Sequence, residues 1–212
     1  FAINPNDVIE KYGADSLRLY EMFMGPIEEN KPWDNNGVVG ARKFLDRVYR
    51  IFEEKQIVEK ENENLVKIYN QTIKKVTTDF ETLNFNTGIS QLMIFVNALS
   101  KETYIPKYIM EGFLKMLNPV CPFITEELWN RLGHSNTISY EPWPICDESK
   151  IVEQNMELPI QVNGKLRAKI VVAKNLSEDE IKQKAISEVK EYLTSEPKKI
   201  IYISNRLVNI VV

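Results

Sequence analysis

Residues that build covalent or metal-supported scaffolds are scarce in this sequence. It has two cysteines, Cys121 and Cys146, in no metal-ligand spacing, and one histidine, His134. This content argues against a disulfide framework and a Cys/His zinc site, so we predict two free thiols, a loop position for His134 and a reducing, cytoplasmic location. No apolar run approaches the ~18 residues that a membrane helix needs, and the N-terminus shows no signal-peptide pattern, so we expect no membrane partner.

Motifs of catalysis are also missing. The sequence contains no glycine-rich phosphate loop and no Ser or Cys nucleophile motif. Glu126 and Glu127 are adjacent, but neighbouring side chains on a helix point ~100° apart, so these carboxylates would not act as a pair. We therefore predict no catalytic residue, no metal site and no cofactor within this chain. Its first residue is Phe1 rather than methionine, which suggests a fragment of a longer protein.

Charge is unevenly distributed along the chain. The net charge is −3. Residues 158–212 contain 10 Lys and Arg against 6 Asp and Glu, a net +4, which leaves −7 for residues 1–157. A basic C-terminal part would suit a polyanionic partner, and uneven solvated charge is an equally good explanation.

Helical periodicity dominates the first two thirds of the chain. Apolar residues recur every three or four positions, which predicts helices over residues 5–12, 16–24, 38–55, 63–82, 87–101, 106–118 and 123–132. Asn4, Asp15 and Asn86 are the expected N-caps. Residues 56–62 are charged and predict a loop. Short connectors between amphipathic helices indicate an up-and-down bundle.

The pattern changes near Leu158. Alternating residues around Asn163-Gly164 predict a hairpin, with Leu166, Ala168 and Ile170 on its apolar face. The capping box Ser177–Glu180 predicts a helix to about Thr194, and two strands follow at 198–203 and 207–212. The fold class is therefore mainly α: a helical bundle followed by a small α+β domain of order ββαββ. The domain ranges are 1–36 for a connector packed on the bundle, 37–144 for the bundle, 145–157 for a linker and 158–212 for the terminal domain.

Two groups of basic residues are the candidate binding surfaces. Lys43, Arg47 and Arg50 share one stripe of a predicted helix, where like charges repel slightly unless an anion lies against them. Lys165, Arg167 and Lys169 alternate along one strand, which would place all three on one face of the sheet. An ordinary solvated surface remains an alternative for each group.

Several longer stretches resemble class I aminoacyl-tRNA synthetases, and the leucine enzymes of bacterial type in particular. These stretches are Asn4–Tyr20, Gly40–Tyr49, the Ile-Thr-Glu-Glu-Leu-Trp helix within Leu117–Gly133, Val-Asn-Gly-Lys-Leu-Arg-Ala-Lys at 162–169, and Ile200–Val212. The resemblance covers nearly the whole chain. It places residues 1–36 just after the family's catalytic Lys-Met-Ser-Lys-Ser loop.

The resemblance implies a partner and a division of labour. The bundle would dock the inner side of the L-shaped leucine tRNA, along its D-arm and anticodon stem, and the terminal domain would cap the outer elbow. These enzymes generally do not rely on anticodon bases. Catalytic and editing domains would lie upstream, so ATP with magnesium would serve the full-length monomeric ligase, and this fragment alone would be inactive.

The same resemblance implies which residues contact tRNA. Lys43 and Arg47 match basic family positions, and Lys43 stands where arginine is common, which would weaken bidentate phosphate binding. The predicted tRNA-binding residues are Lys43, Arg47, Arg50, Lys165, Arg167, Lys169 and Arg206. The alternatives are a non-catalytic protein-interaction module and the equivalent part of an isoleucine or valine enzyme.

Overall fold

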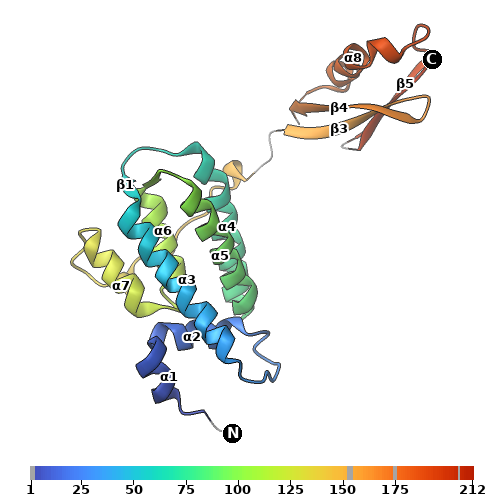
Figure 1. Ribbon diagram of the computed structural model, residues 1–212. Coiled ribbons are helices and arrows are strands. Elements are labelled where there is room, and N and C mark those ends of the chain that lie inside the picture. Colours follow the sequence, from blue (N-terminus) through green and yellow to red (C-terminus); the bar gives the residue numbers. More distant parts are fainter. Residues whose placement is uncertain (1–2, 152–154, 174–175, 205) are drawn as a thin grey trace. The chain divides into compact units, whose positions relative to one another are not determined.

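The computed structural model describes residues 3–151, 155–173, 176–204 and 206–212. The chain divides into a helical unit, Phe1–Ile151, and a sheet unit, Val152–Val212. The helical unit contains α1 to α7, and the sheet unit contains α8 and a four-stranded sheet (Figure 1). The predicted fold class, mainly α with a small α+β part, is confirmed.

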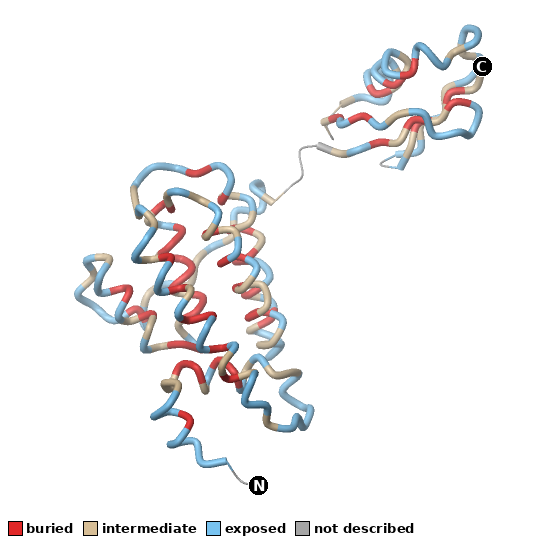
Figure 2. Tube along the Cα trace, viewed as in Figure 1, coloured by how far each residue is buried: buried red, intermediate tan, exposed pale blue. Residues whose placement is uncertain are grey.

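Amphipathic helices build the helical unit around one apolar core. Their bounds are α1 Pro5–Tyr12, α2 Ala14–Phe23, α3 Asn35–Glu54, α4 Glu63–Glu81, α5 Phe85–Lys101, α6 Lys107–Leu117 and α7 Pro122–Arg131. Figure 2 shows buried positions recurring along one side of these helices. In α3, Ala41, Phe44, Leu45, Val48 and Ile51 are buried as their spacing predicts. Burying each large apolar side chain contributes about 1.5–3 kcal/mol before entropy is counted.

Short polar side chains begin several of the helices. The Asn4 side chain accepts a hydrogen bond from the Asn6 N–H at 3.0 Å, as predicted. Asp34 and Asn62 cap α3 and α4 in the same way. The predicted cap at Asp15 is wrong, because α2 already begins at Ala14 and the Asp15 carboxylate accepts hydrogen bonds from α7 instead.

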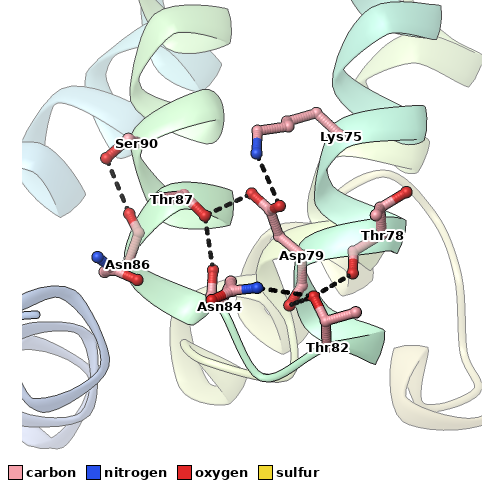
Figure 3. A network of polar contacts seen from close by, with 8 residues as sticks. All are labelled: Lys75, Thr78, Asp79, Thr82, Asn84, Asn86, Thr87 and Ser90. Carbon is pink, nitrogen blue, oxygen red and sulfur yellow. Dashed lines mark hydrogen bonds and ion pairs between the residues drawn. The ribbon is translucent and has the colours of Figure 1, made fainter. Parts of the chain in front are cut away.

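The connection between α4 and α5 is held by a buried carboxylate (Figure 3). Asp79, 4% exposed, accepts hydrogen bonds from Lys75 Nζ and from Thr87 Oγ1, both at 2.7 Å. The backbone N–H of Asn84 also donates to the Asp79 carbonyl at 2.7 Å. These contacts let α5 begin at Phe85, so the predicted cap at Asn86 is wrong and Asn86 lies within the first turn.

A short parallel strand pair was not predicted. Strand β1, Gln56–Val58, lies in the segment expected to be a loop and pairs with β2, Tyr104–Pro106. Three residues are too few to show an alternating pattern, and the partner strand lies beyond two helices in the sequence. The 3₁₀ turns η1, Ile138–Tyr140, and η2, Glu148–Lys150, complete the helical unit.

The sheet unit packs one helix on one face of a sheet with strand order β4-β3-β6-β5. Its elements are β3 Asn155–Val162, β4 Lys165–Ala173, α8 Glu178–Glu188, η3 Lys190–Tyr192, β5 Lys199–Ile203 and β6 Leu207–Val211. The two central strands, β3 and β6, run parallel. The capping box of Ser177 and Glu180 begins α8 as predicted, but α8 ends before Thr194. Strand β3 begins inside the range predicted as a linker.

The hairpin turn depends on two residues with left-handed backbone. Asn163 has φ 50° and Gly164 has φ 78°, the positive pair that a type I′ turn requires. A Cβ at Gly164 would meet nothing within 4 Å, so its cost would be conformational. We expect Gly164→Ala to lower the free energy of unfolding of the sheet unit by about 1 kcal/mol, and Gly164→Asn by less. Urea unfolding of the two variants measures this, and equal losses would contradict it.

Candidate nucleic-acid interface

The first candidate surface is the basic stripe of α3. Lys43 and Arg50 are exposed and Arg47 is half-buried. Arg47 Nη1 donates to Asn97 Oδ1 at 2.5 Å, and Nη2 donates to Ser100 Oγ at 2.7 Å, both on α5. These acceptors are neutral, so they fix the guanidinium without cancelling its charge. Within the described part of the chain, neither Lys43 nor Arg47 forms an ion pair.

The three cations of the stripe do not share one environment. Lys43 and Arg47 border a groove between α2, α3 and α5. Arg50 borders a different groove, whose lining also includes the acidic residues Glu53 and Glu54. The neighbouring Arg42 is occupied, since its Nε donates to Asp46 at 2.8 Å. Lys43 and Arg47 therefore line the same groove, whereas Arg50 lines a different one.

Asn97 and Ser100, which accept hydrogen bonds from Arg47, are functional candidates that the sequence pattern did not predict. They are polar residues three positions apart on α5, whose other faces are largely apolar. That spacing puts both on one side of the helix. The signal was present, but only the packing of α5 against α3 shows which arginine they contact.

The second candidate surface is the hairpin of the sheet unit, and its predicted geometry is wrong. A bulge interrupts the β3–β4 pairing: Ile160 pairs with Ala168, but the next residue, Gln161, pairs with Leu166. The bulge leaves Arg167 unpaired and breaks the alternation. Lys165 therefore pairs with Val162, on the core face, whereas Lys169 pairs with Pro159 on the opposite face.

The outer face of the sheet is consequently not a basic surface opposite an apolar one. Exposed apolar side chains lie on it. Leu166, which was predicted to share the apolar face with Ala168 and Ile170, is 56% exposed and lies on the outer face. The others are Val171, Ile201 and Ile203. Pairing directs all four away from α8, because their partners alternate with the core residues.

The remaining cations of the sheet unit have separate surroundings. Lys169 Nζ lies 2.6 Å from Glu157 Oε1, and this carboxylate raises the pKa of Lys169. The Arg167 guanidinium lies over the Tyr192 ring, 5.2 Å from its centroid. Arg206 is exposed in the turn between β5 and β6. These residues form several small cationic positions rather than one stripe.

Among residues 3–151, 155–173, 176–204 and 206–212, no group of three or more His, Cys, Asp and Glu side chains could hold a metal ion. Of the helices in the same ranges, none has the length and apolarity that crossing a bilayer requires. Cys121 and Cys146 are free thiols, as predicted.

The described chain thus combines a helical bundle, on which Lys43 and Arg47 form no ion pair, with a small α+β unit. Residues 62–183 match the family model described as the anticodon-binding domain of tRNA ligase. The chain belongs to that family. The matched range begins at the N-cap of α4, so Lys43 and Arg47 on α3 lie before it.

One solved structure extends the comparison over nearly the whole chain. It is the crystal structure of the ternary complex of Agrobacterium radiobacter K84 agnB2 LeuRS, tRNA and LeuAMS. The sequence identity is 29% and the TM-score 0.72, with 99% of this chain covered. This chain spans only 29% of the length of that protein.

Proposed function

We propose that this chain binds leucine tRNA and orients it as part of a leucyl-tRNA synthetase. The likeness to a synthetase crystallised with tRNA supports this proposal, as does membership of the anticodon-binding family. Attachment of leucine, with ATP and magnesium, is assigned to the larger remainder of such an enzyme. We accordingly expect the 212-residue chain alone to be inactive in charging, and the whole enzyme to act as a cytoplasmic monomer.

The proposal depends on one observation: Lys43 and Arg47 line the same groove, and neither is neutralised by an ion pair among the described residues. The two side chains lie one helical turn apart, and Arg47 is held by two neutral acceptors from α5. A fixed guanidinium loses little conformational freedom when it binds a phosphate. Each phosphate contact also releases counterions, which makes binding favourable at low salt.

Contacts of this kind can assist charging at a reaction centre elsewhere in the enzyme. Lys and Arg contacts to the backbone determine where the RNA lies, and RNA helices are recognised largely by their shape. Holding the body of a tRNA fixes the direction of its acceptor end. Such orientation can contribute several kcal/mol toward a reaction elsewhere in the enzyme.

The test is the double substitution Lys43→Ala/Arg47→Ala in the 212-residue chain. We expect its affinity for a leucine tRNA transcript to fall about tenfold, because two phosphate contacts are lost. The dependence of log affinity on log salt should also become shallower by about 1 to 2. Fluorescence anisotropy at several salt concentrations measures both quantities.

Lys150→Ala is the matched control, since Lys150 is an exposed lysine on η2, which contacts α4. It should leave affinity and salt dependence unchanged. Thermal unfolding of the double variant checks that loss of the Arg47 contacts has not unfolded the unit. Isoleucine and valine tRNA transcripts test the choice of amino acid. Unchanged affinity and salt dependence in a folded double variant would contradict the proposal.

A further inference from the structure

The groove beside Lys43 and Arg47 has mainly apolar walls. It has a volume of about 750 Å³ and lies between α2, the connector before α3, α3 and α5. Three aromatic side chains line it: Tyr20 and Phe44 are buried, at 4% and 9% exposure, and Phe23 is 38% exposed and so presents a ring to a ligand. The cations Lys43 and Arg47 lie beside these rings, so an apolar surface and two positive charges are available at one place.

Acidic side chains contribute little to the same groove. Asp34 is the acid that lines it, and its carboxylate accepts a hydrogen bond from the Asn36 N–H as the cap of α3. A third cation of the lining, Lys31, is paired with Glu29. The charge left for a ligand is therefore positive and lies with Lys43 and Arg47.

Packing of Tyr20 builds one wall of the groove in advance. The Tyr20 hydroxyl accepts a hydrogen bond from the Asp34 N–H at 2.8 Å. The Tyr20 ring packs edge-on against the Trp33 ring, with the two ring centroids 4.9 Å apart. The ring also lies against the backbone of α3, since a Cβ at Gly37 would come within 2.3 Å of it. The connector and α3 are thus tied to α2 around the groove.

We propose that this groove binds one unpaired base of the RNA, with the adjoining phosphates on Lys43 and Arg47. The inference rests on the proposed function and adds a base-binding site to it. A nucleotide combines a flat apolar ring with an anion, and the groove offers the exposed Phe23 ring, with Lys43 and Arg47 in the same lining. A base within a duplex is stacked and paired, so a loop or a bulge must supply this base.

Gly40 gives a way to fill the groove without touching its cations. It lines the groove, it is exposed, and a Cβ built on it meets nothing within 4 Å. It precedes Lys43 by three positions and Phe44 by four, so a larger side chain would lie over the same face. Leucine and alanine both favour a helix over glycine, so neither substitution should unfold α3.

The experiment compares Gly40→Leu with Gly40→Ala in the 212-residue chain. The probes are a leucine tRNA transcript and a blunt RNA duplex without unpaired bases. We expect Gly40→Leu to bind the transcript about tenfold more weakly, because one base loses its stacking surface. Its affinity for the duplex and its salt dependence should not change, and Gly40→Ala should bind both RNAs like the unmodified chain.

The outcomes separate this inference from the function on which it rests. If Gly40→Leu binds the transcript with full affinity, or weakens both RNAs equally, the base site is contradicted. If Lys43→Ala/Arg47→Ala also leaves transcript binding unchanged, the proposed function itself fails. A loss confined to the transcript in Gly40→Leu, with both RNAs weakened in the double variant, supports both.

Discussion

Replacing Gly112 with alanine is expected to lower the free energy of unfolding of the helical unit by about 3 kcal/mol. Gly112 lies within α6, and a Cβ there would come within 1.9 Å of Tyr69 Oη and 2.7 Å of Tyr69 Cζ. Tyr69 cannot easily move away. It is 7% exposed and packs against Phe95 and Tyr108, with ring centroids at 5.9 and 5.8 Å.

The direction of this effect is opposite to that at an open glycine. Alanine normally stabilises a helix over glycine by about 1 kcal/mol, and Gly40→Ala should show that gain because its Cβ meets nothing. In the double variant Gly112→Ala/Tyr69→Phe the hydroxyl contact is gone while the ring contact remains, so stability should recover only in part. Urea unfolding of each variant provides the measurement. A Gly112→Ala variant as stable as the unmodified chain would contradict the overpacking.

The sequence could not reveal the requirement for glycine at position 112. Helical periodicity marks α6 and its buried face correctly, because that signal is local. The need for glycine arises from a tyrosine on α4 that reaches the same point. The caps at Asn4 and Ser177, by contrast, depend on residues within one turn of themselves and were predicted correctly.

In the candidate site, too, the features that depend on local sequence were predicted and those that depend on packing were not. The helical spacing of Lys43 and Arg47 was readable, since α3 has a long apolar stripe that fixes its orientation. The bracing of Arg47 by α5 was not, because it depends on how two helices pack. The predicted basic face of the hairpin failed for a different reason. Strict alternation assumes an unbroken ladder, and one bulge near Arg167 moves Lys165 and Lys169 to opposite faces.

Asp15 lies on α2 but caps the start of another helix, α7. Its carboxylate accepts hydrogen bonds from the Phe123 N–H at 3.3 Å and the Ile124 N–H at 2.7 Å, in the first turn of α7. Cys121, at the N-cap position of α7, accepts no hydrogen bond from the first turn of α7 with its side chain. Arg18, one turn after Asp15, donates to the carbonyls of Pro119 and Val120. Helix α2 therefore holds both sides of this proline-broken turn.

Removing the cap should be costly. We expect Asp15→Ala to lower the free energy of unfolding by about 2 kcal/mol, because two backbone N–H groups lose their acceptor in a partly buried site. Asp15→Asn retains an acceptor oxygen and caps helices as well as aspartate does, so it should be much less damaging. Chemical unfolding of both variants at neutral pH provides the comparison. Equal losses would show that the oxygen contributes little.

The pH dependence of stability separates two contributions of Asp15: its hydrogen bonds as a helix cap and the negative charge of its carboxylate. Burial raises the pKa of Asp15 above its ordinary value, and this effect exceeds the lowering by the Ile124 and Phe123 N–H groups and by Arg18. A raised pKa means that the folded protein holds this proton more tightly than the unfolded chain does. The stability that Asp15 contributes is thus fullest below its unfolded pKa and declines as pH rises through its folded pKa.

Asparagine cannot ionise, so the stability of Asp15→Asn relative to the unmodified chain should increase as pH rises above about 4, the ordinary pKa of an aspartate. The measurement is the difference in free energy of unfolding between the two proteins at each pH, which cancels the titration of all other groups that they share. If that difference instead fell with pH, the ionised carboxylate would be favoured in the folded state. Its hydrogen bonds to α7 would then outweigh the cost of burying its charge.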